Sequence, residues 1–381
     1  MSRQLKLVFL TTMTIALTCG FFHHAVSPAQ LNFERLHIFL FNLCTGGTLL
    51  LYYTENHDRL SLQATLFFLL SICFALFSFA EWYLPTLIIP LILAVIVERV
   101  RIAYFGSLVP YSLFSSKETV SRKFHQASLL CLSIGLTMSS PVILNNVYGH
   151  WLVLTRLTLD TFFLGFSFPI SLISMSVIFS LMKKNEMRIT LHIKEALFWT
   201  INLGVIIFFL FILAHLFIPQ VMIATTLFVA VTLVLLLYYH QGIQLQQKAF
   251  LTSGILFLLV TSISGILYIL FEFSPGYDPQ EFAPLLRLHA FTALYGWNLS
   301  GMAVISRRSD FPIRLHSHQV IALHWFTVLI LCPLGYFYPL FAVLAVLFYA
   351  WLLQTLLFNY GPIDTKMMTV KEEVLPSSAH Q

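Results

Sequence analysis

The chain has 381 residues, of which 58% are hydrophobic and only 10% are charged, and its mean hydropathy is +0.85. Soluble domains are roughly 45–50% apolar and about 25% charged, so this composition excludes a water-soluble globular protein and indicates a polytopic membrane protein. The formal net charge of +5 requires no nucleic-acid partner, because membrane proteins concentrate Lys and Arg in cytoplasmic loops. The lipid bilayer is the partner that the composition predicts.

Apolar runs of about 20 residues are long enough to cross a membrane, and their number predicts an all-α integral membrane domain of about twelve transmembrane helices over residues 1–359. The predicted spans are 6–26, 32–54, 60–80, 83–103, 125–146, 152–182, 195–218, 220–240, 249–272, 283–306, 318–338 and 340–359. Residues 360–381 are polar, and we expect them to form a short disordered cytoplasmic tail.

Positively charged residues predict the orientation of the spans. If the N-terminus is cytoplasmic, all but three of the 21 Lys and Arg residues fall in cytoplasmic loops or termini, which predicts that both termini are cytoplasmic. The exceptions, Arg35, Arg156 and Arg287, stand at the outer starts of spans 2, 6 and 10, and each precedes a Leu. This spacing indicates three repeated four-helix units, a pseudo-threefold arrangement. The alternative interpretation is that outer-end arginines merely extend to the membrane surface.

Two of these arginines are followed, two residues later, by a histidine. His37 and His289 occupy this place in spans 2 and 10, whereas span 6 has Thr158. In a threefold ring both histidines lie at a similar depth on inner helices, and an intramembrane histidine usually has a partner. Two facing imidazoles suit the axial positions of an iron porphyrin, and outer arginines suit its propionates. The residues alone equally allow hydrogen-bonded structural histidines.

The same stretches resemble a known family. ERLHIFLFNLCTGG (34–47) is similar to the second helix of the haem–copper oxidase and nitric oxide reductase catalytic subunit, particularly the C-family oxidases, in which a histidine after Arg-Leu precedes a Gly-Gly pair. RLHAFTALYGWN (287–298) resembles the tenth helix of that family, in which His-x-His precedes Gly-Trp. The family has twelve helices in three four-helix arcs with both termini inside. The resemblance implies that His37 and His289 are the axial metal ligands of one low-spin haem b, with Arg35 and Arg287 beside it.

The chain departs from the family at the catalytic centre. Arg287 replaces the ligand of the high-spin haem, and the helices that carry the family's copper ligands offer only Asp160 in span 6 and His215 in span 7. A three-histidine copper site cannot be built from these residues, so copper and oxidase-type catalysis are not expected and no catalytic residue is assigned. Arg156 and Asp160, at positions i and i+4, instead predict an ion pair inside the membrane.

The resemblance implies a haem-binding protein of the bacterial cytoplasmic membrane that acts in electron transfer, in haem or nitric oxide handling, or beside a respiratory subunit. His324, in HWF of span 11, resembles a His-Phe-Trp of the family and is expected to hydrogen-bond near the haem or to have a structural role. One alternative is the NnrS-type family of nitric oxide response proteins, although its Gly-His-x-Gly-Arg motif is missing. The other is a cofactor-free transporter or scaffold in which Arg35, Arg156 and Arg287 surround an anion path.

Overall fold

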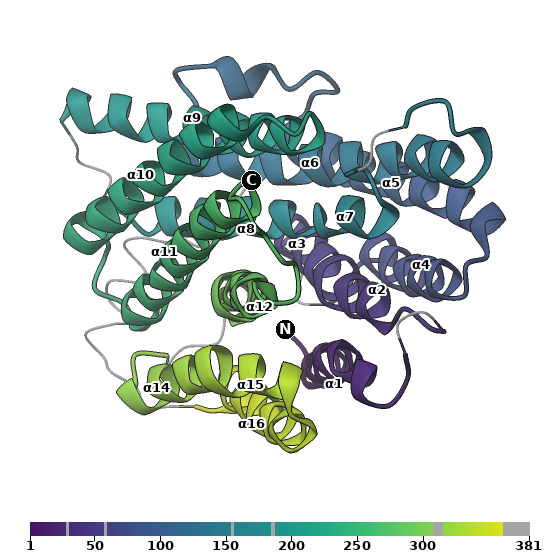
Figure 1. The fold of residues 1–381 in the computed structure, drawn as a ribbon. Helices are drawn as coiled ribbons and strands as arrows, with labels where there is room; N and C mark the ends of the chain where they lie inside the picture. The colour runs from purple at the N-terminus through teal and green to yellow at the C-terminus, as the bar shows by residue number, and fades with distance from the viewer. Residues whose placement is uncertain (28–29, 57–58, 154–155, 184–186, 308–314, 361–381) are drawn as a thin grey trace.

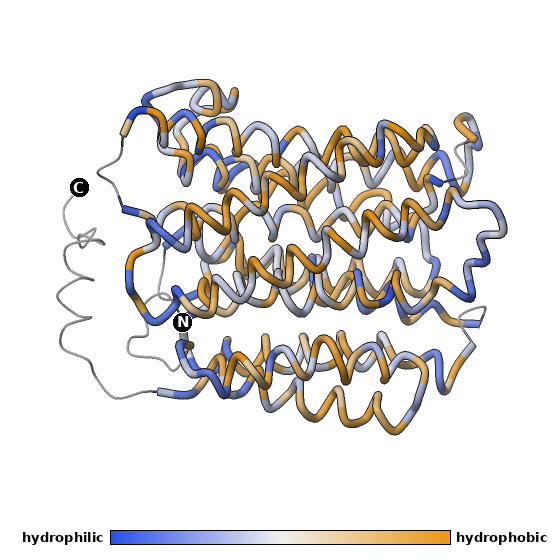
Figure 2. The backbone as a smooth tube through the Cα atoms, turned by 60° about the vertical axis from the view of Figure 1, so that its left-hand side comes forward, coloured by the Kyte–Doolittle hydropathy of each residue, from blue (hydrophilic) through white to orange (hydrophobic). Residues whose placement is uncertain are grey.

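The computed structural model describes the whole chain except residues 28–29, 57–58, 154–155, 184–186, 308–314 and 361–381. The described residues form helices and no strand, with one isolated β-bridge between Met182 and Gly242. Figure 1 shows the helices gathered into one bundle. In Figure 2 hydrophobic residues occupy the middle of the bundle and hydrophilic residues gather toward its two ends. This distribution is typical of a bundle whose ends meet water and whose middle lies in lipid.

The α-helices have the following bounds: α1 (Arg3–Gly20), α2 (Phe33–Ile38), α3 (Thr48–Glu55), α4 (Leu62–Phe79), α5 (Tyr83–Phe105), α6 (Val120–Ile143), α7 (Leu159–Leu164), α8 (Ser167–Ser180), α9 (Arg188–Leu213), α10 (Phe217–Gln241), α11 (Gln246–Glu272), α12 (Ala283–Phe291), α13 (Leu299–Ser306), α14 (His318–Phe326), α15 (Cys332–Phe337) and α16 (Pro339–Phe358). Short 3-10 helices cover Phe22–His24 and Tyr111–Phe114, and π-helical segments cover Phe39–Gly47, Leu144–Gly149, Thr292–Asn298 and Thr327–Leu331.

Among the described residues, nine continuous helical runs are long and apolar enough to cross a membrane. They are Phe33–Glu55, Leu62–Phe79, Val120–Gly149, Leu159–Ser180, Arg188–Leu213, Phe217–Gln241, Gln246–Glu272, His318–Phe337 and Pro339–Phe358. The chain is therefore an all-helical, multi-pass membrane protein. The other three predicted spans fall on α1, α5 and the run from α12 to α13, so the count of twelve and the cytoplasmic location of the termini stay predictions.

Three helical runs lie at the centre of the bundle, and their predicted spans begin with the three exceptional arginines. We call them the first, second and third inner runs: Phe33–Glu55, Leu159–Ser180 and the run from α12 to α13. The π-helical segment Phe39–Gly47 contacts α8, α8 contacts α13, and α13 contacts α3. The apolar window of Phe33–Glu55 is 94% buried and that of Leu159–Ser180 is 67% buried, against 28–44% for the other seven candidate spans. Around them the outer helices pack against their neighbours in sequence, and α1 packs against α16 (Figure 1). The inner positions expected for spans 2 and 10 are thus observed, and the run of span 6 lies beside them.

Two predicted boundaries were wrong. The seventh span was expected to continue to residue 218, but α9 ends at Leu213 and α10 begins at Phe217. His215, with a φ of 54°, makes the turn between them, and Pro219 lies in the first turn of α10, where its missing N–H removes no helical hydrogen bond. The sixth span is helical only from Leu159 rather than from residue 152. The predicted tail, 360–381, lies outside the described residues apart from its first position.

Candidate functional site

His37 and His289 are bound in the same way by the helices that precede them in the chain. His37, on α2, is buried, and its Nδ1 lies 2.8 Å from the backbone carbonyl oxygen of Ala16 on α1. His289, on α12, has its Nδ1 at 2.9 Å from the carbonyl oxygen of Thr261 on α11. A carbonyl oxygen only accepts hydrogen bonds, so these contacts require that Nδ1 carries the proton in each ring. Nε2 is then the nitrogen with a free lone pair in the neutral imidazole.

A glycine lies four residues after each of these carbonyl groups and contacts the histidine ring. A Cβ atom at Gly20 would stand 3.0 Å from Nδ1 of His37, and one at Gly265 would stand 3.0 Å from Cε1 of His289. Each imidazole therefore packs directly against a helix backbone at a point where a side chain would crowd it. Sequence reasoning missed both glycines, because their partners become visible only when the neighbouring helix is known.

Both histidine-bearing inner runs change to π-helical geometry just after their histidine. The π-helical segment in the first inner run begins at Phe39, two residues after His37, and that in the third begins at Thr292, three residues after His289. Such segments are rare and are frequent at functional sites. The glycines of the quoted motifs lie in these segments and permit close helix packing, since a Cβ at Gly46 would come within 2.2 Å of Ile170.

Tyr295 connects the two histidine-bearing runs. Its hydroxyl oxygen lies 2.9 Å from Nδ1 and 3.4 Å from Nε2 of His37. The Tyr295 ring packs on Phe41 and Phe291, with ring centroids 4.8 and 6.1 Å away, and Phe291 packs in turn on Phe21 at 5.9 Å. The structure therefore brings the third inner run against His37 through a tyrosine that sequence reasoning did not single out. Its only sequence signal was a hydroxyl in an apolar run, six residues after His289.

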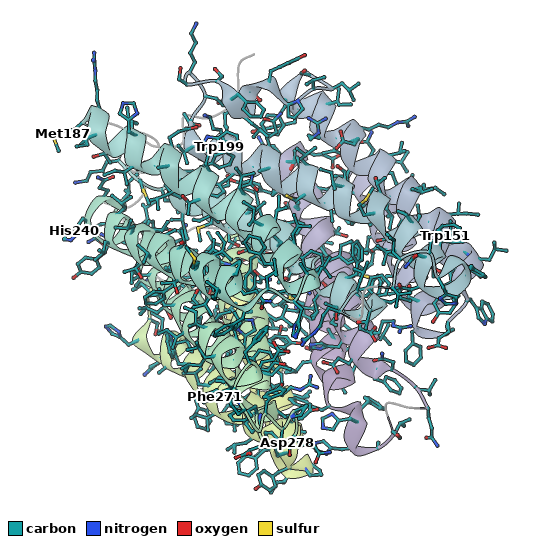
Figure 3. The ribbon with its side chains drawn as sticks, turned by 45° about the horizontal axis from the view of Figure 1, so that its top comes forward. Trp151, Met187, Trp199, His240, Phe271 and Asp278 are labelled. Atoms are coloured by element: carbon teal, nitrogen blue, oxygen red, sulfur yellow. The ribbon has the colours of Figure 1, made fainter. Side chains whose placement is uncertain are left out.

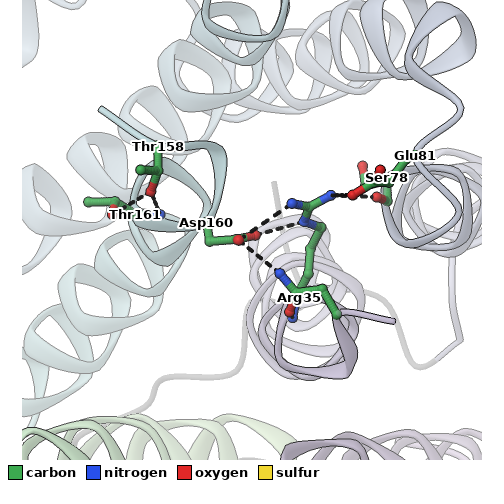
Figure 4. Close-up of polar contacts among 7 residues, drawn as sticks. Arg35, Ser78, Glu81, Thr158, Asp160 and Thr161 are labelled. Carbon is green, nitrogen blue, oxygen red and sulfur yellow. Dashed lines mark hydrogen bonds and ion pairs between the residues drawn. The ribbon is translucent and has the colours of Figure 1, made fainter. Parts of the chain in front are cut away.

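The three exceptional arginines all form ion pairs, and the partner of Arg156 differs from the predicted one. Arg35 donates from Nε to Asp160 Oδ1 at 2.7 Å and from Nη1 to the carbonyl oxygen of Ser78 at 2.9 Å (Figure 4). Arg156 pairs with Glu272. The predicted Arg156–Asp160 pair is wrong because Arg156 precedes α7, whose N-cap is Thr158 in extended geometry. The i,i+4 spacing brings two side chains together only when both residues are helical.

The third pair joins Arg287 to Glu34, and together the three pairs form a closed cycle. One links Arg35 of the first predicted four-helix unit to Asp160 of the second. The next links the second unit to Glu272, at the end of α11 in the third. Arg287 of the third unit returns to the first. We call these contacts the three-pair ring. Each predicted unit thus supplies one arginine, which pairs with a carboxylate of the next unit, and one carboxylate, which pairs with an arginine of the other unit. All three pairs lie at the same end of the bundle.

A pocket of ≈ 200 Å³ opens beside this ring. Its lining includes Gly20, which also contacts His37, together with Glu34, Arg287 and Tyr336. The Arg287 guanidinium lies over the Tyr336 ring, 4.3 Å from its centroid. His23 closes one side through Nε2, which lies 2.8 Å from the carbonyl oxygen of Tyr336. The pocket therefore places an arginine and a tyrosine ring next to the helix that supports His37.

The two remaining candidate histidines have different surroundings. His324 is fully buried, and its Nε2 lies 2.6 Å from the carbonyl oxygen of Tyr295, whose side chain touches His37. His215 is exposed in the turn after α9 and stacks on Phe273 with ring centroids 4.7 Å apart. The expectation that His215 lies inside span 7 is wrong, because the helix ends two residues earlier.

Among the residues that the structure describes, no group of three or more His, Cys, Asp or Glu side chains is placed to hold a metal ion. A bis-histidine haem requires only two such ligands, so that finding does not bear on it. Comparisons with protein-family models, with curated proteins and with solved structures give no match. The function is therefore argued from the site itself.

Proposed function

We propose that the chain is a membrane haem-binding protein in which His37 and His289 bind one b-type haem between the first and third inner helical runs. The observation that carries this proposal is the matched anchoring of the two rings, each by Nδ1 to a backbone carbonyl group. Histidine ligands of metals usually donate their second ring N–H to a carbonyl or carboxylate group, which fixes the ring and its tautomer. Nε2 of each ring would then be the nitrogen that binds the haem iron.

The surroundings of the two rings suit a porphyrin in their chemistry. Phe21, Phe291 and Tyr295 supply the apolar walls that such a ring needs. The Tyr295 hydroxyl lies 3.4 Å from Nε2 of His37, so iron binding requires that this side chain turn aside. The outer pocket, at ≈ 200 Å³, is smaller than the roughly 300–1,000 Å³ of ligand pockets. Rotation of Tyr295 and Phe291 is the change that we propose enlarges the space toward His37.

The arginines have separate roles in this proposal. Arg287 lines the outer pocket and pairs with Glu34, which is 53% exposed, and it is the residue we expect to bind a propionate by charge-assisted hydrogen bonds. Arg35 is committed to Asp160 and to the carbonyl group of Ser78, so we assign it to the three-pair ring. Because Arg35 and Arg156 each pair with a carboxylate, an anion path that passes all three arginines is disfavoured.

A six-coordinate haem supplies one-electron transfer. We therefore propose electron transfer as the function, with a redox partner that docks at the end of the bundle carrying the three-pair ring, in a bacterial cytoplasmic membrane. Copper chemistry is not part of the proposal. The protein's own contribution is to hold both imidazoles in one tautomer and to keep water from the iron by means of the aromatic residues around Tyr295.

A reduced-minus-oxidised absorption spectrum of the purified protein tests the proposal. We expect sharp α and β bands and little change on addition of carbon monoxide, because two imidazole ligands would leave no site on the iron for the gas. His37→Ala and His289→Ala should each abolish this spectrum. His215→Ala is the matched control, since that histidine is exposed in a turn, and it should leave the spectrum intact. Absence of haem after expression with added haem, or an unchanged spectrum in His37→Ala, contradicts the proposal.

A further inference from the structure

A larger pocket, of ≈ 660 Å³, lies at the opposite end of the bundle from the three-pair ring. It is formed where α10 ends, where α11 begins and where α14 passes beside them. Figure 3 shows His240, at this end of α10, at the margin of the molecule. The pocket does not contact either candidate haem ligand, so an inference drawn from it is independent of the proposed function.

The walls of this pocket change from polar to apolar along α11. Lys248 stands near its start and Leu256 two turns further, which at about 1.5 Å per residue is about 12 Å deeper. The polar groups in between are satisfied within the protein: the Thr252 hydroxyl donates to the Lys248 carbonyl oxygen at 2.7 Å, and Trp325 Nε1 donates to the Ser253 hydroxyl at 2.7 Å. The deep part therefore presents mainly carbon to a ligand.

The mouth of the pocket is cationic and aromatic. The Lys248 ammonium lies 5.9 Å from the centroid of the Tyr239 ring, and no ion pair of Lys248 occurs among the described residues. Tyr239 is 62% exposed, and His240 and Gln244 are exposed beside it. Tyr and Trp side chains favour the boundary between lipid and water, and a lysine at that boundary attracts anionic lipid.

We propose that this pocket binds one anionic phospholipid. The phosphate group lies against Lys248, with hydrogen-bond donors from Tyr239 and Gln244, and an acyl chain lies along Leu256 and Ile321. A soluble anion would use only the mouth, whereas the apolar wall continues toward the middle of the bundle and matches a chain. The predicted orientation places this end in the cytoplasmic leaflet, where anionic lipids attract basic residues.

Lipid binding to the purified full chain tests the proposal, with native mass spectrometry as readout and phosphatidylglycerol and phosphatidylcholine as probes. We expect phosphatidylglycerol to be retained preferentially. Lys248→Gln should weaken its binding about fivefold, the effect of one cation at an anionic surface. Lys117→Gln is the matched control, because it removes an exposed cation from the connection between α5 and α6, which does not line the pocket. This variant should bind phosphatidylglycerol as tightly as the unchanged protein does.

A second variant tests the apolar wall separately from the charge. Ala249 is exposed and lines the pocket, so Ala249→Trp should fill the groove and reduce phosphatidylglycerol binding while Lys248 remains. Inorganic phosphate at millimolar concentration should not displace the lipid. Equal retention of both lipids, unchanged binding in Ala249→Trp, or full displacement by inorganic phosphate would each overturn the proposal.

Discussion

His37 lies directly against Gly20, so that a Cβ atom on that glycine would stand 3.0 Å from Nδ1 of the imidazole. Gly265 and His289 repeat the relationship on the other pair of helices. Because the same ring nitrogen also contacts a carbonyl group one turn earlier, the glycine is part of what orients the histidine.

Alanine at these glycines should therefore displace the rings. We expect Gly20→Ala and Gly265→Ala to lower haem occupancy and to destabilise the protein by about 1–3 kcal/mol, the usual result of overpacking. Gly135→Ala is the control, because its Cβ would meet Phe166 at an ordinary 3.7 Å. That variant should gain about 0.5–1 kcal/mol from helix propensity. Haem content and thermal unfolding in detergent measure both effects. Equal behaviour of all three variants would refute the orienting role.

Removal of the Tyr295 hydroxyl separates its effect on the stability of the haem-free protein from its effect on haem affinity. In the haem-free protein Tyr295→Phe loses the contact with His37 and should lower the free energy of unfolding by about 1 kcal/mol. Haem affinity should be unchanged or higher, because the group near Nε2 is gone. Tyr349→Phe is the control, since that buried hydroxyl has no hydrogen-bond partner among the described residues and should be dispensable. A loss of haem in Tyr295→Phe would show that the hydroxyl supports the bound state.

The surroundings of the three-pair ring predict which of its residues costs more stability when replaced. Arg35 is buried and also binds the carbonyl group of Ser78, so Arg35→Leu should cost about 1–3 kcal/mol by leaving an acceptor unsatisfied. Glu34 is 53% exposed, and Glu34→Gln should cost less than about 1 kcal/mol, as expected for a solvated pair. Thermal unfolding in detergent at low and high salt measures both, and only the second effect should shrink with salt. The reverse order would contradict the ring as described.

Membrane character, the approximate positions of nine spans and the inner placement of spans 2 and 10 could be predicted from the sequence, because each depends on apolar length or on the position of charge. The partners of Arg156 and Asp160 could not. Their spacing implies a pair only inside a helix, and the Thr158 side chain caps the helix between them. Nor could the contact of Gly265 with His289 be predicted, because it requires the register of two helices. The π-helical segments have no sequence signature that would have revealed them.

His324 supplies the last prediction. Its Nε2 lies 2.6 Å from the Tyr295 carbonyl oxygen, and its ring packs on Phe250 and Phe257. His324→Phe should preserve the aromatic packing but leave that carbonyl group without its partner, which costs about 1–3 kcal/mol for a buried acceptor. Because Tyr295 touches His37, the absorption bands of bound haem should shift without being lost, whereas loss is expected for His37→Ala. His215→Phe, in the exposed turn, should change neither property. Complete loss of haem in His324→Phe, at unchanged stability, would instead identify His324 as a ligand. A residue that acts only by supporting the Tyr295 backbone would lower the stability of the fold when it is replaced.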